Sequence, residues 1–395
     1  MARNKMTKKQ RQEVERAAKK HPVLITIIIL LVVAIGVCCF LHWKRIIHIP
    51  FLDKIIPQQQ ETLDGVGGAF TDEDITEIKT NDLSVHFLEL GNEFTGDCTL
   101  IKVGDTEILI DAGSRANSAP TIISYVNQFC TDGTLEYVIA THADQDHIAA
   151  FPGVFEAFTC ETIIDFPKTN KNTQVYQNYV AAREAEVSAG ATHYTALECW
   201  NSENGAKRTY ALSDNVSMNF LYQRFYEEST SDENDYSVCM LLTEETGDGK
   251  VNYLFTGDLE KDGEASLVAE NSLPKCKLFK GGHHGSKTSS TDALLSVIRP
   301  DIVCVCCCAG SDEYKAKPEN TFPTQAFVDR VAKYTQNVYV TTLANDTDKG
   351  YESMNGNIVI MSKNGEVKVR CSNNAILLKD TEWFKKNRTA PSAWS

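Results

Sequence analysis

The sequence lacks an internal repeat, and it also lacks the paired CxxC motifs of a structural zinc site. Among its thirteen cysteines, the only CxxC spacing runs from Cys304 to Cys307, and no second pair accompanies it. A zinc site of the usual kind is therefore not indicated. The surrounding run Val303–Cys308 predicts a buried strand that uses cysteine as a small apolar residue.

Basic charge is scarce beyond residue 54. Residues 1–54 hold eleven Lys or Arg and three acids, a net charge of +8, whereas the whole chain carries −14. The remaining residues therefore carry −22. Such a surface repels phosphate backbones at long range, which excludes a broad non-specific nucleic-acid surface but leaves room for a local basic groove.

One apolar run stands out near the N-terminus. Val23–Leu41 is 19 residues long, and Thr26 is its only plainly polar member, so as a helix it could cross about 30 Å of hydrocarbon. A cleaved signal peptide is the main alternative, but the run is long for one and no A-x-A-like site follows it. We therefore expect an uncleaved transmembrane helix over residues 23–42 that anchors the chain in the lipid bilayer.

The charge that flanks this run predicts its orientation. Eight Lys or Arg precede it, and only Lys44, Arg45 and Lys54 follow closely. The positive-inside rule then places the N-terminus in the cytoplasm and the residues after about 45 outside. The expected product is a single-pass protein of the cell membrane. Its thirteen cysteines are unexpected there, because extracytoplasmic domains usually pair or avoid this residue.

The chain divides into five parts on these grounds. They are a basic cytoplasmic tail (1–22), the transmembrane helix (23–42), a poorly structured juxtamembrane linker (43–82), a globular domain (83–375) and a C-terminal tail (376–395). Strands in hairpins come first in the globular domain, and strands alternating with helices follow, which predicts an α/β (α+β) fold of sheets with outer helices. The expected strands are 83–90, 98–103, 107–111, 137–140, 236–243, 251–256, 277–279, 302–308, 337–342 and 356–361, and the expected helices are 119–130, 173–187, 261–271, 291–298 and 325–334.

The strongest chemical signal is the segment Thr141–His147, which reads THADQDH. It holds four candidate ligands directly after an expected strand, namely His142, Asp144, Asp146 and His147. A loop at a strand end can aim such side chains into one cavity, and imidazole with carboxylate suits zinc or manganese. An ordinary solvated loop explains one histidine and one acid, but not four such groups at this spacing.

Two further segments carry weaker signals. Thr256–Asp258 places a carboxylate and a glycine at the end of an expected strand, although Gly-Asp alone is an ordinary turn. Phe279–Ser286 holds the adjacent histidines His283 and His284 between glycines. Such a pair is an unusual choice for a core, so at least one is a candidate ligand, with a surface loop as the alternative.

In this order, the three segments resemble the metallo-β-lactamase superfamily, and specifically the domain of ComEC-type competence proteins. Phe87–Cys98 is similar to that group's opening FLDVGQGDS, Ile108–Gly113 to its ILIDGG, and Asn234–Ser237 to its Asn-x-x-Ser. The resemblance covers about residues 83–370 and implies a metallo-β-lactamase αββα sandwich with metals at the sheet edge. Residues 83–375 are accordingly expected to be a hydrolase domain.

The chain also departs from the superfamily pattern. Asp144 stands where many members have histidine, a change that favours harder metals such as manganese. Asn92–Thr95 replaces a tight turn with a longer loop. The usual ligand between the first motif and Asp258 is not identifiable, and Asp165 and His193 are the nearby candidates. ComEC has a polytopic channel region, so a single transmembrane helix does not imply DNA uptake.

The resemblance implies a site for two divalent metal ions, zinc or manganese. His142 and Asp144 would bind one ion, Asp146 and His147 the other, and Asp258 would bridge them. One of His283 and His284 would complete the ligand set, most simply His284, while the other would contact substrate or protonate the leaving group. Asp146, His283 and His284 are thus the expected catalytic residues, and the expected phosphate contacts are Lys280, Ser286, Lys287 and Ser289.

A phosphodiester is the favoured substrate, because paired metals can steady both the attacking and the leaving oxygen. Short or single-stranded nucleic acid fits this expectation, and so does an envelope polymer such as phosphorylcholine-bearing teichoic acid. A lactam is less favoured because Asp144 and the missing histidine depart from the β-lactamase pattern. The alternative from outside the enzymes is a non-catalytic, membrane-anchored binding module on the same scaffold.

Overall fold

A computed structural model describes residues 69–311, 313, 317–345 and 350–394. The expected transmembrane helix at 23–42 and the basic tail lie outside these residues. Within them, no helix combines the length and the apolar character that a bilayer crossing requires.

The first sheet contains eight strands. Their spatial order is β16 (Glu366–Cys371), β15 (Ile358–Lys363), β1 (Leu83–Phe87), β2 (Thr99–Val103), β3 (Thr106–Ile110), β4 (Thr134–Ile139), β5 (Thr159–Asp165) and β6 (Thr192–Thr195). The strands from β16 to β3 pair antiparallel as hairpins or through β1, whereas β3, β4, β5 and β6 run parallel. Loops that follow the parallel strands therefore emerge at one edge.

The second sheet also contains eight strands. Their spatial order is β14 (Gly350–Ser353), β13 (Val338–Asn345), β12 (Ile302–Ala309), β11 (Leu278–Lys280), β10 (Gly249–Phe255), β9 (Cys239–Thr246), β8 (Val216–Leu221) and β7 (Thr209–Ala211). Strands β10 to β13 run parallel to one another, and β7 to β9 are antiparallel.

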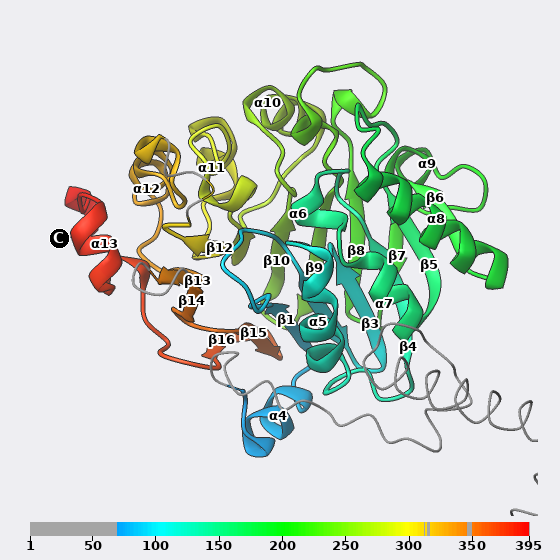
Figure 1. The fold of residues 1–395 in the computed structure, drawn as a ribbon, viewed down its shortest axis with the longest axis horizontal. Coiled ribbons are helices and arrows are strands. Elements are labelled where there is room, and N and C mark those ends of the chain that lie inside the picture. The colour runs from blue at the N-terminus through cyan, green and yellow to red at the C-terminus, as the bar shows by residue number, and fades with distance from the viewer. Residues whose placement is uncertain (1–68, 312, 314–316, 346–349, 395) are drawn as a thin grey trace, which may run out of the picture. The chain divides into compact units, whose positions relative to one another are not determined.

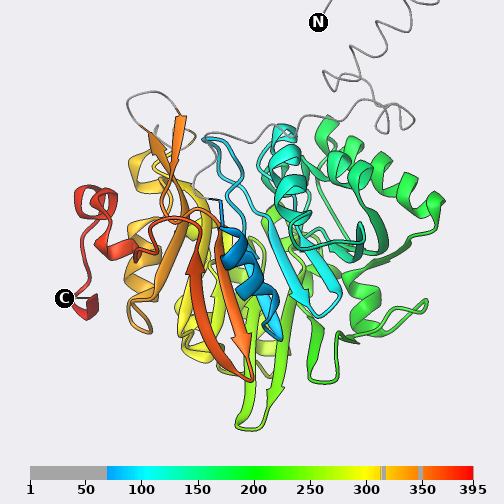
Figure 2. The same ribbon diagram turned by 90° about the horizontal axis from the view of Figure 1, so that it is seen from below.

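Helices flank the two sheets on both sides, with the strands in the middle (Figures 1 and 2). One group is α5 (Ala119–Val126), α6 (Gln145–Ile148), α7 (Phe151–Ala157), α8 (Gln174–Ala189) and α9 (Ala196–Asn201), and the other is α10 (Lys261–Glu270), α11 (Asp292–Ile298) and α12 (Gln325–Val331). This arrangement confirms the expected αββα sandwich.

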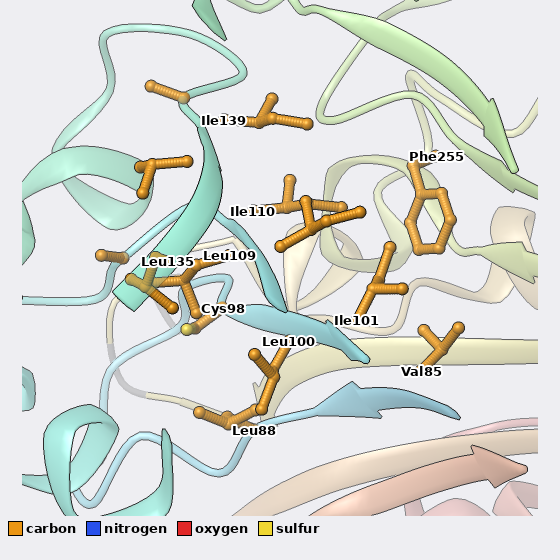
Figure 3. Packing of buried hydrophobic residues seen from close by; sticks show 14 of the residues in the cluster. Val85, Leu88, Cys98, Leu100, Ile101, Leu109, Ile110, Leu135, Ile139 and Phe255 are labelled. Carbon is orange, nitrogen blue, oxygen red and sulfur yellow. The ribbon is translucent and has the colours of Figure 1, made fainter. Parts of the chain in front are cut away.

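Two apolar clusters hold the layers together. The larger one includes side chains of both sheets, such as Val85, Leu109 and Phe255 in Figure 3, together with the inner faces of α5 and α7. The smaller one lies between the second sheet and α10 to α12. Strand β12 contributes to both, because Cys304 and Cys306 belong to the first cluster and the alternate residues to the second, as the two-residue period of a strand requires. The cysteine-rich run is thus the buried strand that its composition predicted.

The structure differs from the predicted boundaries at both ends of the domain. Helix α4 (Asp72–Lys79) occupies part of the predicted linker, with Thr71 and Asp74 forming a capping box and Ile78 buried. At the other end, α13 (Glu382–Asn387) and the turn at Ser392–Trp394 lie in the predicted tail, and Trp394 packs in the smaller cluster. Both segments are part of the folded unit because they bury apolar side chains.

Candidate metal centre

The THADQDH segment follows β4 and turns at once into a short helix. Asp144 occupies the N-cap position of α6, so Asp146 and His147 lie in the helix's first turn. The carbonyl of Asp146 accepts from Asp97 N at 3.0 Å. A Cβ on Gly113 would come within 1.6 Å of the same carbonyl oxygen, which explains why a glycine stands there.

The Gly-Asp segment follows β10 in the opposite sheet. Gly257 has φ +53°, and a Cβ there would meet Ser237 Oγ at 2.8 Å and Thr141 Cβ at 2.9 Å. The glycine therefore lets the two strand ends approach each other. Ser237 Oγ accepts from Asp258 N at 3.0 Å, which fixes the backbone beside the Asp258 carboxylate.

The His283–His284 pair lies on a strained turn after β11. Their φ values are +44° and +52°, a left-handed conformation that non-glycine residues adopt at a cost. His283 N donates to Gly257 O at 3.3 Å, so this turn is tied to the Gly-Asp segment. The two strained residues therefore lie where the three segments meet.

These segments bring two imidazoles and two carboxylates together. His147 Nε2 lies 3.3 Å from His284 Nε2 and 3.2 Å from Asp258 Oδ2. His284 Nε2 lies 3.1 Å from Asp258 Oδ2 and 3.2 Å from Asp146 Oδ2. Of the two adjacent histidines, His284 is thus the one whose ring reaches the cluster, whereas His283 Nε2 stays 3.9 Å from Asp258.

Each clustered imidazole has an oxygen partner on its other nitrogen. His147 Nδ1 lies 2.8 Å from Asp111 Oδ2, and His284 Nδ1 lies 2.9 Å from the Cys306 carbonyl. A carbonyl can only accept, so the His284 Nδ1 carries the proton when the ring is neutral, and Nε2 presents a lone pair. Oxygen partners of this kind orient metal-binding histidines in proteins.

His142 also has an oxygen partner on its Nδ1 atom, and Thr141 links it to Asp111. Thr141 Oγ1 donates to Asp111 Oδ2 at 2.8 Å, so its oxygen accepts from His142 Nδ1 at 3.1 Å. His142 Nε2 is buried without a hydrogen-bond partner among the described residues and lies 3.8 Å from Asp144 Oδ2. A buried lone pair of this kind is costly unless it has a partner.

The charged side chains of the cluster shift one another's pKa values. Burial opposes protonation of His147 and His284, but nearby carboxylates, Asp258 foremost, outweigh it and hold both pKa values well above the ordinary value. Despite burial, the same histidines hold the pKa of Asp258 well below its usual range. Burial lowers the pKa of His142 well below its ordinary value. The Asp258 carboxylate is therefore anionic, and the Nε2 atoms of His147 and His284 that face it and each other need a proton or a cation between them.

The donor set fits divalent metal ions. The Nε2 atoms of His147 and His284 face each other and the carboxylate of Asp258. Buried Asp258 Oδ1 and His142 Nε2 have no hydrogen-bond partner among the described residues. Mixed nitrogen and carboxylate donors suit zinc, manganese or iron. Among the predicted ligands, Asp146, His147, Asp258 and His284 contact one another. His142 Nε2 and Asp144 Oδ2 lie 3.8 Å apart, and the assignment of all six residues as ligands stays a prediction.

Sequence reasoning missed two buried acids, Asp97 and Asp111. Asp97 is grouped with His147, Asp258 and His284 as a possible ligand set, and its Oδ1 lies 3.2 Å from His284 Nδ1. Both acids lie inside the segments that carry the family resemblance, and their burial at 1% exposure is what the sequence could not show.

The predicted phosphate contacts are placed less favourably. Lys280 is only 3% exposed and pairs with buried Asp97. Ser289 is buried, and its hydroxyl donates to Leu259 O at 2.6 Å, while buried Ser286 is linked to Thr288 at 2.9 Å. Only Lys287 is exposed. Lys280 therefore neutralises the buried Asp97 carboxylate, and the Ser289 hydroxyl is engaged by a backbone carbonyl, so both side chains have partners within the protein.

The candidates for the intermediate ligand contact each other instead. His193 Nε2 lies 2.9 Å from Asp165 Oδ1, and Arg183 and Tyr179 donate to Asp165 Oδ2 at 2.6 and 3.0 Å. Arg183 already neutralises this carboxylate. The structure therefore gives neither Asp165 nor His193 a contact with the clustered side chains.

The chain is similar to several known proteins. The family model described as the metallo-beta-lactamase superfamily matches residues 91–184. The chain is 28% identical to recombination protein 2 of Haemophilus influenzae over 53% of its own length and 23% of that protein's. It is 26% identical to competence protein ComA of Neisseria gonorrhoeae, over 64% of this chain and 30% of that protein. The matches therefore span less than a third of each relative's length.

Solved structures with similarity include the metallo-beta-lactamase fold protein YhfI from Bacillus subtilis. It has 11% identity and a TM-score of 0.39, with 67% of this chain and 97% of that chain covered. The metallo hydrolase Igni18 from Ignicoccus hospitalis has 14% identity and a TM-score of 0.37, with 73% and 98% covered. Taken with the two-sheet architecture, the matched superfamily segment and the competence-protein relatives identify the chain as a ComEC-like protein of the metallo-β-lactamase fold.

Proposed function

We propose that this protein is a membrane-anchored phosphodiesterase of the nuclease-like kind that uses two divalent metal ions, zinc or manganese. The observation that carries the proposal is the convergence of His147 Nε2 and His284 Nε2, 3.3 Å apart, on the carboxylate of Asp258. Bound metal ions supply Lewis acidity that activates water and steadies a phosphoryl group. The chain's own residues supply the rest.

In this proposal, His142 and Asp144 would hold one ion, Asp146, His147 and His284 would hold the other, and Asp258 would contribute to both. Asp144 Oδ2 and His142 Nε2 are 3.8 Å apart, which leaves room for a shared partner. An additional carboxylate in place of histidine favours a harder metal such as manganese.

His283 has a different role from its neighbour. Its Nδ1 lies 3.0 Å from Glu260 Oε1, and Thr288 Oγ1 donates to the same oxygen at 2.7 Å. Glu260 thereby fixes the ring, whose side chain is 20% exposed, with Nε2 on the side of Asp258. We assign His283 to contact the substrate at the leaving-group side.

The charge of the chain argues for a particular kind of phosphodiester. The −22 net charge beyond residue 54 repels a long duplex, whose affinity depends on many phosphate contacts. Short or single-stranded nucleic acid suffers less from this repulsion, and the names of the competence-protein relatives favour it over an envelope polymer. The second candidate is a phosphorylcholine-type esterase outside the membrane.

The test combines metal analysis with a substrate panel. The full-length chain, supplied with manganese or zinc, is assayed on bis(p-nitrophenyl) phosphate, single-stranded DNA, p-nitrophenyl phosphorylcholine and nitrocefin. We expect phosphodiester turnover that Asp146→Ala abolishes. Turnover of nitrocefin alone would contradict the proposal, and metal binding without any turnover would favour a non-catalytic binding module.

A further inference from the structure

Lys171 places a positive charge at the rim of the metal centre. It lies in the segment between β5 and α8, and because β5 runs parallel to β4, this segment emerges at the same sheet edge as the THADQDH loop. Its ammonium forms an ion pair with Asp144 Oδ1. The other oxygen of that carboxylate lies 3.8 Å from His142 Nε2, so Lys171 is one carboxylate away from the centre.

The segment that carries Lys171 is held firmly. Glu233, which is 7% exposed, accepts from Thr169 Oγ1 at 2.5 Å and from Asn170 N at 2.7 Å. Lys171 N then donates to Thr169 Oγ1 at 2.9 Å. The two bonds to Glu233 tie the segment to the loop before β9, and the third orders the segment internally, so the ammonium is positioned before any ligand arrives.

The Lys171 ammonium has N–H donors that its ion pair with Asp144 does not use. It has three N–H donors, and the pair with Asp144 accounts for one. The Lys171 side chain is 32% exposed, in contrast to Lys280, which is 3% exposed and committed to Asp97. A lysine ammonium carries its charge at neutral pH.

An anionic substrate needs such a local cation, because the rest of the surface repels it. We propose that Lys171 binds a non-bridging phosphate oxygen of the substrate and is the residue that gives this acidic domain its preference for a phosphoryl group. The inference rests on the proposed phosphodiesterase activity for its substrate, but anion binding at Lys171 can be measured without turnover.

The experiment compares three variants of the full-length, metal-loaded chain. Lys171→Met removes the charge, Lys171→Arg retains it, and Lys168→Met is the matched control. Lys168 lies three positions earlier in the same segment, and its ammonium is bonded to the Glu227 carbonyl. Binding of inorganic phosphate is measured by calorimetry, KM and kcat are measured on bis(p-nitrophenyl) phosphate, and metal content is measured for every variant.

We expect Lys171→Met to weaken phosphate binding and raise KM by about tenfold or more, the usual consequence of losing one charge-assisted hydrogen bond. Metal content and kcat should change little, Lys171→Arg should retain most of the affinity, and Lys168→Met should resemble wild type. Phosphate affinity that is unchanged in Lys171→Met, or absent in wild type, would overturn the inference. Phosphate binding that depends on Lys171 without phosphodiester turnover would instead overturn the proposed function alone.

Discussion

Asp258 lies against both imidazoles at the middle of the centre. His147 and His284 both lie within 3.2 Å of its Oδ2, while its Oδ1 has no hydrogen-bond partner among the described residues. A carboxylate with one oxygen toward two imidazoles and the other unpartnered is suited to bridge two cations. Its two neighbours, Gly257 and Ser237, fix the backbone without using the carboxylate.

Asp258→Ala is therefore expected to lose bound metal and activity together while the fold persists. Metal content by mass spectrometry and secondary structure by circular dichroism measure the two effects separately. Asp262→Ala, an exposed acid of α10, is the control and should retain both. Metal content at the wild-type level in Asp258→Ala would show that the bridging role is wrong.

Glu89 gives a pH dependence that is independent of the centre. It is 1% exposed, and burial raises its pKa to about 7 from 4.5, although Ser353 Oγ donates to it at 2.5 Å. The folded state thus binds the proton more tightly than the unfolded state, so this group makes the protein less stable as pH rises from about 4.5 to 7.

Glu89→Gln removes that titration. At pH 8 the variant should be more stable than wild type by up to about 3 kcal/mol, since one pKa unit corresponds to about 1.4 kcal/mol. The difference should shrink as pH falls toward 4.5, where wild type is protonated as well. Denaturant unfolding of both proteins at pH 5 and pH 8 measures this difference. Because the other titrating acids contribute equally to both free energies of unfolding, their contributions cancel when one is subtracted from the other. An equal difference at both pH values would contradict the assigned pKa.

At the scale of elements, strong local patterns were sufficient for most of the fold. The hairpin of β2 and β3, the helices α5, α8, α10 and α11, and the buried strand β12 were predicted to within a few residues. Strands β5 to β8 were not predicted. Strands β6 and β7 have only four and three residues, too few for a clear signal, whereas β8 alternates between buried and partly exposed residues and was missed in spite of this pattern. Helix α4 was missed although Thr71 and Asp74 form a capping box, because the predicted linker around it lacked an apolar period.

At the site, too, the sequence predicted some features and missed others. Motifs at strand ends predicted that His147, Asp258 and His284 come together, since strands deliver their following loops to one edge, and the structure places these three in contact. The ligand role of the six residues stays a prediction. The roles of Asp97, Lys280 and Lys171 could not be predicted, because each depends on a partner from another segment of the chain. Lys280 is the clearest example, since a lysine beside two histidines suggested a phosphate contact, whereas its partner is a buried acid 183 positions earlier.

Helix α10 supports the turn that follows the paired histidines. Buried Glu264 accepts from Ser290 N at 2.6 Å and from Thr291 N at 2.7 Å, and Ser289 Oγ lies 3.2 Å away. These bonds satisfy backbone donors just before α11, which a helix start would otherwise leave without partners.

Glu264→Ala is expected to destabilise the fold by about 2 to 5 kcal/mol, because it leaves one buried and one partly buried N–H group without their acceptor. The measurement is the free energy of unfolding in denaturant. Glu270→Ala, at the exposed end of the same helix, is the matched control and should be close to neutral. A loss below 1 kcal/mol for Glu264→Ala would show that water replaces the carboxylate.

At the scale of the whole molecule, the cysteine content no longer conflicts with an extracytoplasmic domain. The eleven described cysteines are free thiols, and ten of them are buried. Burial raises the pKa of several, to about 11 for Cys130 and to about 12 for Cys276. Because the thiolate is the reactive form, such residues resist oxidation and need no disulfide partners.

The topology prediction belongs to this scale and rests on the sequence of residues 1–54. Their +8 charge lies mainly before the apolar run Val23–Leu41, so we expect the tail to stay in the cytoplasm and the hydrolase domain to lie outside. An added protease should then digest the domain in intact spheroplasts, while a cytoplasmic marker protein stays intact in the same sample. Moving the charge tests the cause, since replacing the eight basic residues before the run with glutamine should reduce the fraction of accessible domain. Full protection of the wild-type domain, with digestion only after lysis, would reverse the orientation and place the centre on the cytoplasmic side.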